Sequence, residues 1–80
     1  MTLTESEARM LRLLEREPTR VFTFSELEAG IGYGERITEG KIREIAGGLR
    51  AVLRHQRPGE DLVVDVWGCG YRLREGQRNA

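Results

Sequence analysis

Two Thr-x-x-Glu segments, at residues 4–7 and 23–26, place the strongest limits on how this chain can fold. In such a segment the threonine hydroxyl accepts a hydrogen bond from a backbone N–H of the first helical turn, and the glutamate reaches back to the N–H of the threonine. Each segment therefore predicts the start of a helix. Apolar residues recur at helical spacing after the first segment, and Pro18 limits that helix to about Thr4–Glu17.

The second segment opens a shorter helix. We expect it to reach about Ala29, with Gly30 as the residue just beyond its end. Val21 and Phe22 precede it as a short extended stretch. Glycines at positions 32, 34 and 40 then indicate a loop before the next regular element.

A third and longest helix is predicted from about Ile37 to the region of His55–Pro58, because apolar residues return at helical spacing. Its inward stripe is expected to consist of Ile42, Ile45, Leu49, Val52 and Leu53. The remaining side of the helix is then left for solvent or for a partner.

The chain is predicted to end in a β-hairpin. Asp61–Val66 is β-branched and apolar enough for a strand, Gly68 and Gly70 bracket a tight turn, and Tyr71–Arg74 can return antiparallel. Three helices followed by a hairpin within 80 residues give an α+β fold with the layout of a winged helix-turn-helix. We assign this single domain to residues 1–75 and expect residues 76–80 to form a disordered tail.

Charge and composition narrow the range of functions. The net charge is zero, but residues 1–40 carry −3 and residues 41–80 carry +3. Such a separation suits a protein with one face for a polyanion, although it also arises by chance. One cysteine and one histidine cannot form a disulfide or a structural zinc site, and no P-loop or G-x-S-x-G motif is present. We expect no enzyme activity, no metal and no cofactor, and a cytoplasmic protein without a membrane segment.

One arc of the third helix, about 60° wide and roughly opposite the apolar stripe, holds four residues: Arg43, Gly47, Arg50 and Arg54. A helix with one apolar face and one row of arginines fits the major groove of DNA, where guanidinium groups reach guanine edges or phosphates. An arginine-rich helix that is merely solvated gives the same pattern, so both interpretations stay open here.

Gly47 and Gly48 stand in the middle of this helix, where each costs about 0.8–1.0 kcal/mol relative to alanine. The missing side chains suggest a close approach of the helix to a DNA backbone, to another helix or to a partner protein. The alternative is a kink that divides the helix into two shorter pieces.

Three side chains of the hairpin are further candidates for contact with DNA: Trp67, Arg72 and Arg74. Trp67 lies near the turn and is either exposed for contact with DNA or a partner, or folded back into the core. Arg72 and Arg74 alternate with Leu73, which places them on the outer face of the strand, where they line DNA phosphates or serve solubility. Tyr71 is expected to pack its ring inward.

Three motifs occur in order along the chain: Leu-Thr with a glutamate three residues on, Val-x-Thr-x-x-Glu-Leu, and a closing Val-x-Gly-x-Gly-Tyr-x-Leu. They are formed by Leu3, Thr4, Glu7, Val21, Thr23, Glu26, Leu27, Val66, Gly68, Gly70, Tyr71 and Leu73. With these motifs the chain resembles, nearly end to end, the winged-helix effector domain of OmpR/PhoB-type response regulators. The closing motif is the most specific of the three.

The resemblance implies that the third helix enters the major groove, that the hairpin wing contacts the minor groove or the backbone, and that the loop between the second and third helices touches RNA polymerase. Two departures stand out. Gly47 and Gly48 occupy positions where the family usually carries basic or polar residues. Asp65 stands where the family often has threonine, and its carboxylate repels phosphate unless an arginine neutralises it. Because Met1 lies almost at the first helix, we expect a stand-alone domain without a receiver.

Two functions are therefore compared. The first is a small DNA-binding transcription regulator that holds double-stranded DNA, as one copy or as a homodimer on paired half-sites, through Arg43, Gly47, Arg50, Arg54, Trp67, Arg72 and Arg74. The second is a partly degenerate winged helix that docks on RNA polymerase or another transcription regulator through its glycine-rich helix and Trp67. The first function is our prediction, and the second is the alternative, which the zero net charge, the glycine pair and Asp65 favour.

Overall fold

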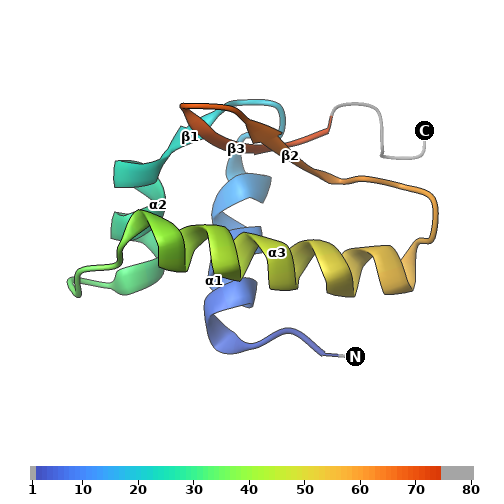
Figure 1. Cartoon of the computed structure of the whole chain (residues 1–80), viewed down its shortest axis with the longest axis horizontal. Helices are drawn as coiled ribbons and strands as arrows, with labels where there is room; N and C mark the ends of the chain where they lie inside the picture. Colours follow the sequence, from blue (N-terminus) through green and yellow to red (C-terminus); the bar gives the residue numbers. More distant parts are fainter. Residues whose placement is uncertain (1, 75–80) are drawn as a thin grey trace.

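The computed structural model describes residues 2–74 of the chain. Its elements follow in the order α1 (Glu5–Arg16), β1 (Phe22–Thr23), α2 (Phe24–Gly32), α3 (Glu39–Gln56), β2 (Val63–Val66) and β3 (Gly70–Leu73). In Figure 1, α3 runs across the molecule, α1 crosses behind it, and the three strands lie together along one edge. The predicted order of three helices and a C-terminal hairpin is confirmed. The tail predicted at residues 76–80 lies outside the described residues.

Both predicted capping boxes are formed. The hydroxyl of Thr4 accepts from the backbone N–H of Glu7 at 3.1 Å, and the Glu7 carboxylate accepts from the N–H of Thr4 at 3.0 Å. Thr23 and Glu26 make the same pair of hydrogen bonds, at 3.2 and 2.9 Å. The starts of α1 and α2 are thus the predicted ones, because each cap is satisfied by side chains three residues away in the sequence.

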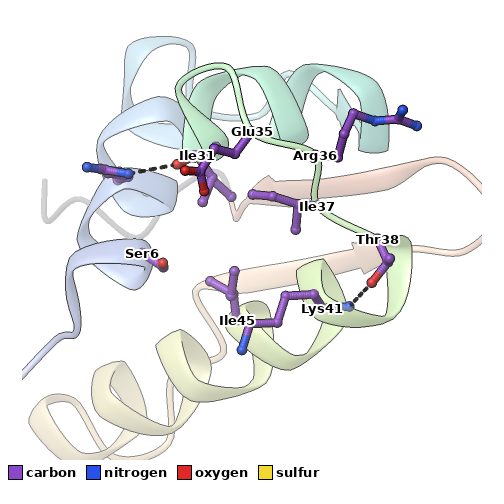
Figure 2. Close-up of a pocket in the computed structure, with 10 residues that line it drawn as sticks. Ser6, Ile31, Glu35, Arg36, Ile37, Thr38, Lys41 and Ile45 are labelled. Carbon is purple, nitrogen blue, oxygen red and sulfur yellow. Dashed lines mark hydrogen bonds between the residues drawn. The ribbon is translucent and has the colours of Figure 1, made fainter.

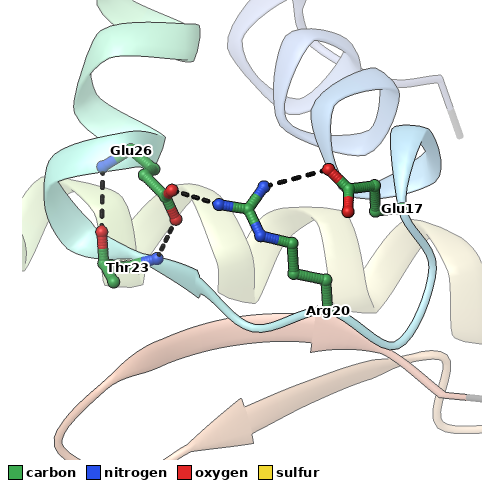
Figure 3. A network of polar contacts seen from close by, with 4 residues as sticks. All are labelled: Glu17, Arg20, Thr23 and Glu26. Atoms are coloured by element: carbon green, nitrogen blue, oxygen red, sulfur yellow. Dashed lines mark hydrogen bonds and ion pairs between the residues drawn. The ribbon is translucent and has the colours of Figure 1, made fainter.

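Arg20 connects the second capping box to the end of α1 (Figure 3). Its guanidinium donates to Glu26 and, at 3.3 Å, to Glu17, which is the C-cap of α1. The hydrogen bond from the backbone N–H of Thr23, reinforced by the charge of Arg20, lowers the pKa of the Glu26 carboxyl. Arg20 therefore links the start of α2 to the end of α1 at the surface.

The predicted end of α2 at Ala29 is wrong, because α2 continues to Gly32. Tyr33 is the C-cap, with the left-handed dihedral angles φ 51° and ψ 50°, and so takes the place that we expected for Gly30. Gly30 lies inside the helix against α1, where an added Cβ would come within 2.6 Å of the Leu13 Cδ2 atom. This glycine permits close packing of two helices instead of a turn.

α3 is one continuous helix from Glu39 to Gln56, so a break at the glycine pair is ruled out. It begins two residues later than predicted, because the hydroxyl of Thr38 caps it by accepting from the N–H of Lys41 at 3.1 Å. The whole predicted apolar stripe is buried: Ile42, Ile45, Leu49, Val52 and Leu53. The stripe anchors α3 to the core and leaves its opposite side on the surface.

The hairpin is joined by a third strand, β1, which overlaps the extended stretch predicted at Val21 and Phe22, although its pairing with the hairpin was not predicted. β1 pairs antiparallel with β3, which gives the strand order β1-β3-β2 and places Phe22 opposite Tyr71. Gly70 makes this pairing possible, since a Cβ at that position would overlap the carbonyl group of Phe22. β2 begins at Val63, two residues later than predicted, and β3 covers Gly70–Leu73 in place of Tyr71–Arg74.

The helices and the inner face of the sheet share one hydrophobic core. Its fully buried large side chains are Met10, Leu14, Leu27, Ile31, Ile42 and Leu49. Tyr71 belongs to this core, as predicted, and its ring meets that of Phe24 edge to face with centroids 6.1 Å apart. Among the helices within residues 2–74, none combines the length and apolar character that crossing a membrane requires.

Candidate functional site

The candidate site is the side of α3 that faces away from the core, together with the neighbouring wing. Arg43, Gly47 and Arg54 are exposed there, and Arg50 is half-buried on the side toward the sheet. The prediction that these four residues lie opposite the buried stripe is confirmed. Their role in binding stays a prediction at this point.

Two of the arginines contact the chain segment that follows α3. This segment turns back above the helix, so that it runs in the opposite direction to α3 (Figure 1). The Nε and Nη2 atoms of Arg54 lie 2.9 and 2.8 Å from the Oδ1 atom of Asp61. The Nη2 group of Arg50 donates to the backbone carbonyl of Val63 at 3.2 Å. Both guanidinium groups are therefore held beside the wing.

Arg43 contacts the same returning segment two residues further on. Its Nη1 atom lies 3.9 Å from the Oδ2 atom of Asp65, and its Nη2 group donates to Glu39 at 2.9 Å. The hydrogen bond with Glu39 raises the pKa of Arg43. The guanidinium also lies 5.2 Å from the ring centroid of Phe24, within range of a cation–π contact. The arginines of α3 thus meet three alternate positions of the returning chain: 61, 63 and 65.

Asp61 brings together cations from two parts of the chain. Its carboxylate accepts from Arg54, and its backbone carbonyl accepts from the Nε group of Arg74 at 2.8 Å. The hydrogen bond from Arg54, with the charges of Arg74 and Arg50 in support, lowers the pKa of the Asp61 carboxyl. The sequence singled out all three arginines but missed Asp61, because no local pattern around that aspartate shows that it meets α3.

The two glycines of α3 have different surroundings. An added Cβ at Gly48 would clash with the carboxylate of Glu7, so this glycine allows the N-terminal cap of α1 to approach α3. The sequence left open a close approach to DNA, to another helix or to a partner protein, and for Gly48 the close approach to another helix holds. An added Cβ at Gly47 would meet nothing within 4 Å among the described residues. Contacts within residues 2–74 thus give no reason for a glycine at position 47.

The candidate residues of the wing lie on different surfaces. Trp67 is 88% exposed at the β2–β3 turn, so of the two placements that the sequence left open, the exposed one holds. Arg72 stands opposite Val64 in the hairpin register, one residue from the buried Tyr71, and therefore on the other face of the sheet. Its Nη1 group donates to the carbonyl of Leu73 at 3.1 Å. The structure thus does not bring Arg72 into the row of arginines on α3.

An open hollow of about 400 Å³ lies between α1, the α2–α3 loop and the start of α3 (Figure 2). Its apolar lining includes Ile31, Ile37 and Ile45. Arg9 borders it, donates to the carbonyl of Ile31 at 3.0 Å and lies 3.9 Å from the ring centroid of Tyr33, which is 65% exposed. The seven candidate residues predicted from the sequence all lie outside this lining.

Three helices, with the exposed side of the third beside a three-stranded antiparallel sheet, define a winged-helix domain. Residues 1–73 match the family model described as "Transcriptional regulatory protein, C terminal", and the chain belongs to this family. The family consists of DNA-binding domains of transcription regulators and is not a family of enzymes. The resemblance to OmpR/PhoB-type effector domains is confirmed. A comparison with curated proteins gives no match.

Proposed function

We propose that this domain regulates transcription by binding double-stranded DNA with α3 in the major groove and the β2–β3 wing on the backbone or in the minor groove. The observation that carries the proposal is the exposed side of α3, where Gly47 lies among three arginines and beside the wing. With 18 residues α3 is about 27 Å long, and a major groove about 12 Å wide admits one helix.

The arginines of α3 are suited to positioning the domain on DNA. Arg43 and Arg54 are about half exposed, so each can present some of its five N–H donors to phosphates or guanine edges. Asp65 would repel a phosphate, and the guanidinium of Arg43 offsets only part of that charge, because it lies 3.9 Å from Asp65 and pairs more closely with Glu39 at 2.9 Å. Gly47 leaves the backbone of α3 uncovered between them, which permits a close approach to the DNA.

We further infer two partners besides DNA. A single module of this size buries only about 600–1,000 Å² on DNA, so useful specificity calls for two copies on paired half-sites. The loop between α2 and α3 then remains available to RNA polymerase or another regulator. The exposed ring of Tyr33 and the neighbouring hollow support contact at that loop.

The proposal is tested by fluorescence anisotropy with a duplex that carries a site enriched by selection from random DNA. The logarithm of the binding constant should fall linearly with the logarithm of salt concentration, with a slope that corresponds to several released counterions. Arg54→Ala and Arg43→Ala should weaken binding and reduce the slope by about one each. Arg12→Ala makes the same charge change on an exposed position of α1 and should leave binding almost unchanged.

The same titration also tests the protein-docking alternative. If the domain acts by docking on RNA polymerase or another regulator, selection should enrich no site, and binding to DNA should be weak and independent of sequence. Equal effects of Arg12→Ala and Arg54→Ala would likewise contradict a DNA-binding face on α3, because they would show that only the total charge matters.

A further inference from the structure

Asp61, just before the wing, lies beside arginines from α3 and from the end of β3. Arg54 donates to the side chain of Asp61, Arg74 donates to its backbone carbonyl at 2.8 Å, and Arg50 donates to the carbonyl of Val63 at 3.2 Å. Arg54 and Arg74 thereby contact Asp61, and Arg50 contacts the same chain segment two residues further on. The Asp61 side chain contacts only one of them directly, namely Arg54.

Stability of the fold does not account well for this arrangement. The side chains of Arg54 and Asp61 are 56% and 51% exposed, and an ion pair in that setting contributes little to the free energy of unfolding. An acidic residue beside a face for DNA also repels phosphate and so weakens binding through charge alone. The presence of an aspartate at position 61 is therefore better explained by its effect on Arg54.

The geometry of the pair supplies such an explanation. A guanidinium has five N–H donors, and Asp61 occupies donors of the edge formed by Nε and Nη2. The remaining donors stay available, while the long side chain of Arg54 is already held in one place. An arginine that is held before binding loses less conformational freedom when it contacts a phosphate.

We propose that Asp61 is a positioning residue for DNA binding. It holds Arg54 beside Arg50 and Arg74, so that the three guanidinium groups contact neighbouring phosphates of the DNA backbone together. This inference rests on the proposed function, since it assumes that α3 and the wing meet DNA. It predicts that Asp61 acts through the hydrogen bond to Arg54 and not through its charge.

Two substitutions separate these effects. Asp61→Asn and Asp61→Ala remove the same negative charge, but only the asparagine keeps a side-chain oxygen that can accept from Arg54. The probe is a fluorescein-labelled 20-bp duplex of random sequence, titrated by anisotropy at several KCl concentrations. The asparagine variant should bind about 2- to 10-fold more tightly than the alanine variant, which is the effect of ordering one long side chain before binding.

The test is completed by repeating both substitutions in an Arg54→Ala background, where the difference between asparagine and alanine should disappear. Thermal melts of every variant show that the domain is folded, and the exposed position of Asp61 makes large changes in Tm unexpected. Equal affinities of the two single variants, or a difference that persists without Arg54, would overturn the role of Asp61 while leaving the proposed function intact. A wild-type domain that shows no salt-dependent binding would overturn both.

Discussion

Replacing Gly47 with alanine should make the isolated domain more stable and its complex with DNA weaker. Gly47 lies in the interior of α3, and an added Cβ would meet nothing within 4 Å in the part of the chain that the structure describes. The helix propensity of alanine should therefore be gained in full, about 0.8–1.0 kcal/mol. For a domain of this size, a gain near 1 kcal/mol raises Tm by roughly 4–8 °C.

Gly48→Ala is the matched control, because it makes the same chemical change one residue further along the same helix. Its Cβ would clash with the carboxylate of Glu7, which then has to move and give up its hydrogen bond to the backbone N–H of Thr4. Losing that bond costs about 0.5–1.5 kcal/mol and offsets the gain in helix propensity. We therefore expect Gly48→Ala to leave Tm nearly unchanged.

Gly47→Ala should weaken DNA binding although it stabilises the free domain. If the backbone of α3 approaches DNA closely there, an added methyl group should cost about 1–3 kcal/mol of binding free energy, or roughly fivefold or more in affinity. Differential scanning calorimetry and anisotropy titrations on the same samples measure both quantities. A lower Tm for Gly47→Ala would contradict the description of α3. A higher Tm with unchanged affinity would show that Gly47 does not face the DNA.

Two further predictions concern the wing and the response to acid. Gly70→Ala should lower the urea midpoint far more than Gly68→Ala. A Cβ at position 70 would overlap the backbone carbonyl of Phe22, which cannot move aside, whereas the φ of 80° at Gly68 costs a residue with a side chain about 1–2 kcal/mol. Equal midpoints would refute the β1–β3 pairing. The hydrogen bond from the N–H of Ile37 lowers the pKa of the Glu28 carboxyl in the folded state. The ionised Glu28 carboxylate thus stabilises the fold above the ordinary glutamate pKa of about 4.3, and this stabilisation is lost as the pH falls through the lower pKa of the folded state. When the urea midpoint is measured as a function of pH, Glu28→Gln should therefore show a smaller decrease toward acid pH than the wild-type domain.

The parts of the fold that depend on neighbouring residues could be predicted from the sequence. Thr4 and Thr23 cap helices through glutamates three residues away, and a pattern of that length can be read directly. The apolar stripe of α3 likewise places Gly47 and Arg54 on the exposed side, because the period of a helix fixes which residues share a face. The i, i+4 spacing of Glu39 and Arg43 likewise predicts their ion pair.

The parts that depend on contacts between distant segments could not be predicted. Gly30 resembles a helix terminator until α1 is seen to pack against it, and a two-residue strand at Phe22 carries too little pattern to reveal its pairing with β3. The same holds for the site. The sequence yields the row of arginines, but only the folded chain shows that Asp61 meets Arg54.

A backbone amide titration by NMR tests most directly whether the exposed side of α3 and the wing form the DNA-binding face. Adding duplex DNA that carries an enriched site to the ¹⁵N-labelled domain should shift the amide signals of Gly47 and Arg54 and the indole N–H signal of Trp67 most strongly. The signals of Tyr33 and the hollow beside it should move little. Shifts centred on Tyr33, with α3 unaffected, would contradict the account.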